Sequence, residues 1–290
     1  MIRWVTYKSM ATLEKFLQVE QRLQRDEGNR GIQHILPDKP VLEKAINSLL
    51  LCRNIVILTG FPCLLTNQIK IETDGLAGAL ALGRTLNHLN RSVTILIENE
   101  YHSVIGPLVN WHNNQFNCNI ALDCSLTLEP DGVIAIERTG RSENGNYYTM
   151  RGYLMEGVEQ FDTVYLDRHQ AIAKVAIGDG GNEAGMGPVK EKVKKFIKNG
   201  ELIASCSPSD YTLVSSVSTW GGYGLALGIS KAAGVVGEVS IESERLISEK
   251  IMQCGICDGI TGQVSLGVDG LEWESTSRLI EDLLEILENE

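Results

Sequence analysis

The 290-residue sequence has neither an excess of basic residues nor a long apolar run. Its formal net charge is −11, whereas binding to nucleic acid or to an anionic membrane requires positive surface. No run approaches the ~18 apolar residues of a membrane span. The charged N-terminus lacks the apolar core and cleavage site of a secretory signal. We therefore expect a soluble, cytoplasmic protein without nucleic-acid or membrane partners.

Several familiar motifs are also missing. Seven cysteines, an odd number in a chain too long to need disulfide staples, indicate reduced thiols. Cys254 and Cys257 form a single CxxC pair without a second pair at zinc-ligand spacing, so we interpret them as small buried thiols. The five histidines show no HExxH-like spacing, and no GxSxG elbow of a serine hydrolase occurs.

The apolar residues that are present favour an α/β fold. They make up 43% of the chain, enough for a sizeable core. Four short runs, 55–58, 93–97, 133–136 and 175–177, are typical of buried strands, and each leads into a polar loop. Helical spacing is found at 11–25, 41–50, 76–89 and 188–200. This alternation predicts a mostly parallel sheet flanked by helices, a Rossmann-like three-layer architecture. With no linker evident, we expect one domain over 1–290 that includes the helices of about 1–50.

The segment 175–188, VAIGDGGNEAGMGP, carries the densest group of glycines and acids. A dinucleotide loop, GxGxxG, would need a third glycine where Glu183 stands, and a phosphate loop would need a lysine that is absent. Carboxylates would also repel a phosphate. Asp179, Asn182 and Glu183 therefore indicate a loop that binds a cation or the amino group of a substrate.

Further acids follow the predicted strands. Ligands of open parallel sheets bind at the carboxyl ends of the strands, so we expect Glu72, Asp74 and Glu137 to join Asp179 and Glu183 there. Two unit charges ~4 Å apart cost about 4 kcal/mol at an effective dielectric near 20, so a cation must offset them. Oxygen ligands without histidine or cysteine suit Mg²⁺ or Mn²⁺. The alternative is that Glu72 and Asp74 cap a helix and Glu137 pairs with a surface arginine.

Six motifs occur together: TGFP at 59–62, ETDG at 72–75, ERTGR at 137–141, YYTMRG at 147–152, IGDGGNEAGMG at 177–187 and STWGGYGLAL at 218–227. In content and order they resemble the D-glutamate cyclase family, over about residues 30–275. The resemblance implies a stand-alone form of the family's C-terminal domain. It also implies conversion of an amino acid, D-glutamate, to 5-oxo-D-proline and water.

A mechanism for that reaction can be proposed from particular side chains. Glu183 is expected to take a proton from the α-ammonium, with Asp179 and Asn182 beside it, and Arg138 and Arg141 to grip the α-carboxylate. The divalent cation would polarise the side-chain carboxylate as a Lewis acid. The expected substrate contacts are Thr59, Gly60, Arg151 and Trp220.

Two other functions fit the same residues. One is a metal-dependent hydrolase of a phosphate ester or a cyclic amide, in which the acids activate water. The other is a non-catalytic protein that binds a metal or an amino acid. The apolar content also suffices for a homo-oligomeric interface.

Overall fold

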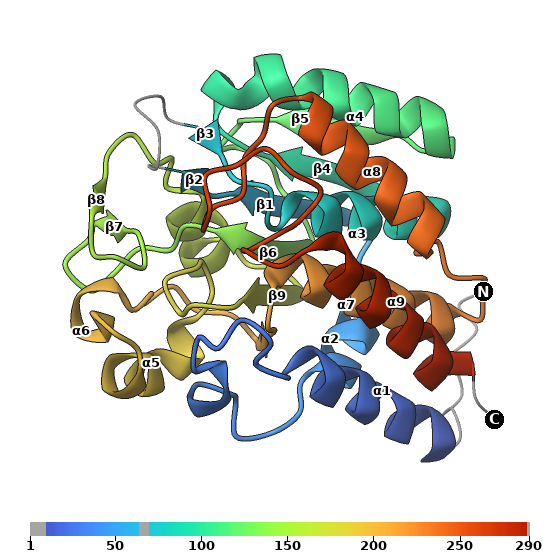
Figure 1. Ribbon diagram of the computed structural model, residues 1–290, viewed down its shortest axis with the longest axis horizontal. Helices are drawn as coiled ribbons and strands as arrows, with labels where there is room; N and C mark the ends of the chain where they lie inside the picture. Colours follow the sequence, from blue (N-terminus) through green and yellow to red (C-terminus); the bar gives the residue numbers. More distant parts are fainter. Residues whose placement is uncertain (1–9, 64–69, 289–290) are drawn as a thin grey trace.

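The computed structural model describes residues 10–63 and 70–288. Its centre is a six-stranded sheet in which every pair of neighbours runs parallel (Figure 1). The order across the sheet is β10-β9-β6-β1-β4-β5. The strands are β1 (Asn54–Gly60), β4 (Ser92–Leu96), β5 (Ile120–Asp123), β6 (Gly132–Arg138), β9 (Ala173–Gly178) and β10 (Tyr211–Val214). The parallel α/β fold expected from the sequence is confirmed, and the four predicted runs are β1, β4, β6 and β9.

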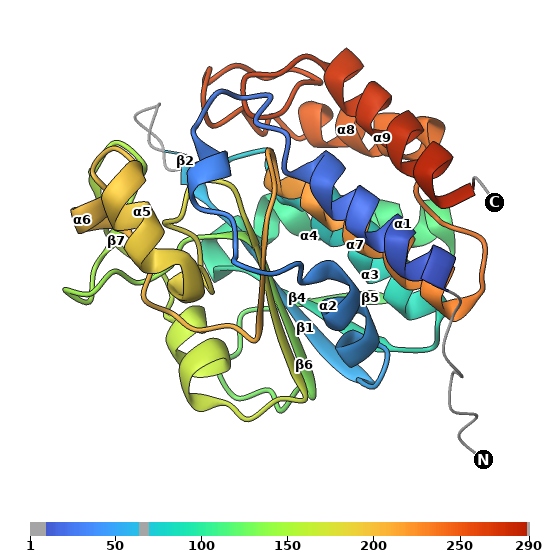
Figure 2. The same ribbon diagram turned by 90° about the horizontal axis from the view of Figure 1, so that it is seen from below.

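One face of the sheet carries most of the helices (Figure 2). Ile55 and Ile57 of β1 point to this face and share a buried cluster with Phe16 near the start of the chain. The N-terminal helices are therefore part of the same core as the sheet. The helices on this face are α1 (Met10–Leu23), α2 (Leu42–Leu49), α3 (Leu76–His88), α4 (His102–Phe116), α7 (Ser218–Ala233), α8 (Ile241–Gln253) and α9 (Trp273–Glu288).

The opposite face is covered by η3 (Asp162–Arg168), a single π-helix. Val56 and Leu58 of β1 point to this face, because successive residues of a strand alternate between faces. They pack with Phe161 and Tyr165 in a second buried cluster. The three-layer expectation is thus confirmed, with a much thinner helical layer on this side.

Two helices of the larger layer, α3 and α7, pack unusually close together. A Cβ added at Gly222 would lie only 2.7 Å from the Cα atom of Gly78, so the two backbones touch. Glycine is required wherever backbones approach this closely. The glycines of segment 218–227 therefore serve helix packing.

The remaining elements are short, and several gather at the carboxyl edge of the sheet. The segment 188–200, predicted as one helix, is interrupted after Phe196 and turns through Asn199, whose φ is +63°. No helix among the described residues is long and apolar enough to cross a membrane. These short elements are η1 (Ile32–His34), β2 (Pro62–Cys63), β3 (Lys70–Ile71), η2 (Asn99–Tyr101), β7 (Tyr147–Tyr148), β8 (Leu154–Met155), η4 (Gly187–Val189), α5 (Lys190–Phe196) and α6 (Gly200–Ile203).

Candidate active site

A cavity of about 310 Å³ lies beyond the carboxyl ends of β1, β6 and β9. We call it the acid cavity because five carboxylates line it. Its charged and polar lining residues come from loops far apart in the sequence, and an apolar wall completes it. The lining residues are Arg30, Phe61, Pro62, Cys63, Glu72, Glu137, Thr149, Met150, Arg151, Tyr153, Asp179, Asn182, Glu183, Gly259, Ile260 and Asp269.

The glycine-rich loop after β9 is folded around the carboxylate of Glu183. Its oxygens accept backbone N–H groups from Asp179 (3.2 Å), Gly180 (2.6 Å) and Gly181 (2.6 Å). Gly181 has a φ of +95°, and a Cβ there would lie 2.4 Å from the side chain of Val193. The loop conformation therefore depends on glycine at this position and on the charge of Glu183.

Glu137, at the end of β6, is the most strained residue of the cavity. Its φ is +39°, a backbone angle that residues other than glycine rarely adopt, and Gly75 packs directly against it. Its carboxylate is buried, and Oε2 has no hydrogen-bond partner among the described residues. Burial, followed by the charges of Asp179 and Glu183, raises the pKa of Glu137 well above its usual value. Backbone strain and an unpaired buried oxygen together are typical of a functional residue.

Arg30 is the basic group at the centre of the cluster. Its Nη1 atom lies 2.8 Å from Oδ1 of Asp179, and Nη2 pairs with Oδ1 of Asp269. The second oxygen of each aspartate is buried without a hydrogen-bond partner among the described residues. Burial raises the pKa of Asp179 to about 8 even though Arg30 acts in the opposite direction. One guanidinium thus compensates only part of the negative charge.

Glu72 and Asp74 precede α3 and occupy different surroundings. Glu72 lines the cavity, and burial together with the charge of Asp269 raises its pKa well above the usual value. Asp74 accepts hydrogen bonds from the backbone N–H groups of Gly75, Ser218 and Thr219, so it holds the first turn of α7. Burial, with Asp269, raises the pKa of Asp74 to about 6.

Two sets of carboxylates have the spacing of a cation site. In each set, one oxygen from every residue lies within 4.8 Å of the others: Asp74, Asp179 and Asp269 in one, and Glu137, Asp179 and Glu183 in the other. The three cavity acids with an unpartnered buried oxygen, Glu137, Asp179 and Asp269, are all members of these sets. Carboxylates without nitrogen or sulfur ligands suit a hard cation such as Mg²⁺ or Mn²⁺, and they equally attract an ammonium group.

Comparison with known proteins relates this site to a family. The family model described as D-glutamate cyclase-like, C-terminal, matches residues 19–284. Human mitochondrial D-glutamate cyclase is 30% identical over 325 residues, which cover 96% of this chain and 53% of the human protein. The chain belongs to the D-glutamate cyclase-like family. It spans about half the length of that human relative.

In this member of the family, the two arginines expected to grip a substrate are engaged elsewhere. The guanidinium of Arg138 is fully buried and contacts both oxygens of Glu98, at 2.6 and 2.5 Å. Arg141 pairs with Asp167 at 2.5 Å and also donates to Thr163. Neither arginine lines the acid cavity, so this geometry gives them no contact with a ligand held there.

The other expected substrate contacts are divided between cavity and core. Arg151 and Asn182 line the cavity, and Asn182 also donates to the backbone oxygen of Tyr148 at 2.9 Å. Thr59 and Gly60 end β1 next to the cavity without lining it. Trp220 is fully buried, and its indole N–H donates to Thr276, which makes it a core residue.

Sequence reasoning missed two members of the site, Arg30 and Asp269. Arg30 lies between α1 and η1, and Asp269 lies in the loop before α9, so neither residue follows a predicted strand. The signal available in the sequence was the dipeptide Asp269-Gly270. In the structure both residues have positive φ, +63° and +76°. A left-handed aspartate before glycine is a common turn, so this pattern alone does not distinguish a site from a loop.

Proposed function

We propose that the acid cavity converts D-glutamate to 5-oxo-D-proline and water. The observation that carries this proposal is the presence, in a member of the D-glutamate cyclase-like family, of buried acids with unpaired oxygens around one arginine. Such a cavity attracts the ammonium group of an amino acid. In the reaction, the amine nitrogen bonds to the side-chain carboxyl carbon and gives up two protons. One carboxylate oxygen leaves with both protons as water.

Glu137 is the best-placed proton acceptor for the α-ammonium. Burial raises the pKa of Glu137, and a carboxylate whose pKa is raised holds a proton more readily, so it can return that proton to the departing oxygen. Glu183, the base expected from the sequence, has both oxygens occupied by three backbone N–H groups of its own loop. We therefore assign Glu183 the role of shaping the loop, and Glu137 that of moving the proton.

The two carboxylates of the substrate need positive partners. Arg30 lies among the acids, with Asp179 and Asp269 on two of its nitrogens, and is suited to the end of the substrate that reacts. Arg151 is exposed at the cavity wall and is suited to the α-carboxylate near the mouth. Holding both ends folds the substrate so that its amine lies against its side-chain carboxyl group, and orientation of this kind supplies much of the rate of an intramolecular reaction.

A divalent cation fits the same residues. Asp179 belongs to both carboxylate sets, so it is the ligand common to either position. When bound, Mg²⁺ or Mn²⁺ would polarise the substrate carboxyl group as a Lewis acid and reduce the repulsion between the acids. Glu137 and Asp269 would supply their unpaired oxygens to the ion or, in its absence, to the substrate ammonium.

The test is a product assay on the purified chain. D-Glutamate and L-glutamate are each incubated with the protein, with and without Mg²⁺ or Mn²⁺, and 5-oxoproline is measured by chiral chromatography. We expect 5-oxo-D-proline, and a loss of at least a hundredfold in kcat for Glu137→Gln. Glu281→Gln, which removes an exposed carboxylate on α9, serves as the matched control and should keep full activity.

Other outcomes would support the alternatives. Release of phosphate from phosphate esters, with no lactam from glutamate, would indicate a hydrolase. Hydrolysis of added 5-oxo-D-proline would be the reverse of the proposed reaction at the same site. Saturable binding of glutamate without any product would indicate a binding protein, and would contradict the role given to Glu137.

A further inference from the structure

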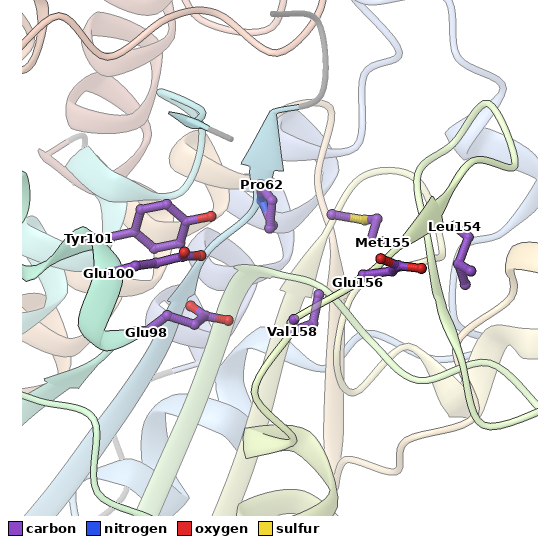
Figure 3. A pocket seen from close by; sticks show the side chains of 9 residues that line it. Pro62, Glu98, Glu100, Tyr101, Leu154, Met155, Glu156 and Val158 are labelled. Atoms are coloured by element: carbon purple, nitrogen blue, oxygen red, sulfur yellow. The ribbon is translucent and has the colours of Figure 1, made fainter. Parts of the chain in front are cut away.

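A second pocket, of about 260 Å³, borders the acid cavity at Pro62, and Figure 3 shows its lining side chains. We call it the Tyr101 pocket. Pro62 is the residue that the two spaces share, and none of the acids of the acid cavity reaches this one. It is lined by Pro62, Glu98, Glu100, Tyr101, Leu154, Met155, Glu156, Gly157 and Val158.

The charged side chains that line the Tyr101 pocket are all acidic. Three of its lining residues are glutamates, and no lysine or arginine among the residues that the structure describes lines it. Glu98 is neutralised from behind by Arg138, which contacts both of its oxygens. Glu100 and Glu156 are exposed and leave two negative charges at the rim. A ligand for this pocket must therefore be positive.

The hydroxyl of Tyr101 is a second, independent indication of a ligand. The side chain is only 6% exposed, and its hydroxyl, which lies beside the carboxylate of Glu100, has no well-aligned hydrogen bond to a described residue. Figure 3 shows this oxygen and the carboxylates of Glu98 and Glu100 pointing across the pocket toward Met155 and Glu156. A buried polar group without a partner costs free energy, and a bound donor would remove that cost. Burial, with Glu100 and Glu98, raises the pKa of Tyr101, so the phenol stays neutral and can accept a hydrogen bond.

The spacing of the acids selects the kind of cation. Among the described residues, the carboxylate groups close enough to share a metal ion are the two sets that contain Asp179, and Glu98, Glu100 and Glu156 are not among them. A metal ion needs several oxygens converging at one point. An organic cation can instead place one ammonium group near Tyr101 and Glu100 and lay its chain on the apolar wall of Pro62, Leu154 and Met155.

We propose that the Tyr101 pocket binds a primary organic ammonium ion with a short aliphatic chain. The ammonium group donates to the Tyr101 hydroxyl and lies between the carboxylates of Glu100 and Glu156. The chain contacts Met155 and Val158. This site is separate from the acid cavity and does not depend on the reaction proposed there.

The test uses n-butylammonium chloride as the probe and methionine methyl groups as reporters. Met155 lines the Tyr101 pocket and Met150 lines the acid cavity, so ¹³C-methyl NMR distinguishes the two sites in one titration. The signals are assigned with Met155→Leu and Met150→Leu. We expect a saturable shift of the Met155 signal at constant ionic strength, a much weaker response to n-butanol, and a Met155 shift that is independent of any response of Met150, since the acid cavity can also attract an ammonium group.

Variants then test the contacts. Tyr101→Phe should weaken binding of n-butylammonium about two- to tenfold, the loss of one hydrogen bond. The double variant Glu100→Gln/Glu156→Gln should weaken it about fivefold through two exposed charges. Glu281→Gln and Glu137→Gln should leave the Met155 shift unchanged. Because Glu100 and Glu156 are exposed, the double variant tests the site even if Tyr101→Phe fails to fold.

Several results would overturn the proposal. They are the absence of a saturable Met155 shift, equal binding of n-butanol, and a response confined to Met150. A Met155 shift produced by Mg²⁺ or Ca²⁺ in place of the amine would show a metal site. Undiminished binding in the variants would show that the substituted residues do not contact the ligand.

Discussion

Replacing Glu137 with glutamine should stabilise the cation-free protein while abolishing turnover. Oxygens of Glu137, Asp179 and Glu183 lie within 4.8 Å of one another. At an effective dielectric of 20, an ionised pair at that separation costs about 3.5 kcal/mol. Protonation limits this cost, because the raised pKa of Glu137 lets the folded protein take up a proton instead. We expect Glu137→Gln to raise the free energy of unfolding by roughly 2–3 kcal/mol at pH 8.

The sign of the pH dependence follows from the direction of the shift. A carboxyl group whose pKa is raised on folding contributes fully below its unfolded pKa, about 4.3, and that contribution is lost as the pH rises through the folded pKa. The difference between Glu137→Gln and the unchanged protein should therefore be largest at pH 8 and shrink toward pH 4.

Urea unfolding in the presence of EDTA, at pH 8 and pH 5, measures this difference directly. The same titration with Mn²⁺ should stabilise the unchanged protein and have less effect on the variant. Glu281→Gln should show neither effect. A Glu137→Gln variant that is no more stable than the unchanged protein at pH 8 would refute the view that the acids repel one another in the folded state.

Three other changes have equally definite outcomes. Arg30→Gln should lower the free energy of unfolding at pH 8 by roughly 2–3 kcal/mol, because it leaves Asp179 and Asp269 unpaired; urea unfolding that detects no loss would contradict the central role of Arg30. Gly75→Ala should cost at least about 2 kcal/mol in thermal unfolding, because its Cβ would lie 2.5 Å from that of Glu137. Gly145→Ala, at a similar positive φ but with open space around the added Cβ, should lower the free energy of unfolding by only about 1 kcal/mol. Equal losses for the two variants would contradict the steric explanation. His112 is buried, and burial followed by Arg84 lowers its pKa to about 3, so stability should fall as the pH drops from about 6.5 toward 3, by at most about 1.4 kcal/mol per pH unit. His112→Gln should flatten that slope in acid unfolding, and an unchanged slope would assign it to other groups.

The sequence predicted the edge of the sheet and much of the acid cavity, because parallel strands bring their carboxyl ends together. Glu137 and Asp179 each follow an apolar run, so they come together as soon as these two strands lie close to each other in the sheet. The same reasoning could not assign Arg138. Neighbouring residues on a strand point in opposite directions, and here Glu137 faces the acid cavity while Arg138 faces Glu98.

Residues in loops were beyond this kind of prediction. Arg30 and Asp269 belong to segments with no periodic pattern, and their pairing depends on how α1 and α9 pack against each other on the outer layer. Trp220 illustrates the opposite error. An aromatic residue among glycines is compatible with a pocket wall, but here Gly222 lets α7 approach α3, and the indole of Trp220 is buried in the core.

The pairing of Arg30 with Asp179 and Asp269 also bears on the order in which the site is made during synthesis. The ribosome releases the glycine-rich loop and most of the acids well before Asp269. Until Asp269 is made, the guanidinium of Arg30 has only Asp179 of these two aspartates to pair with. In a growing chain, the pairing of Arg30 with both aspartates therefore forms only after the glycine-rich loop and the other acids of the cavity have been made.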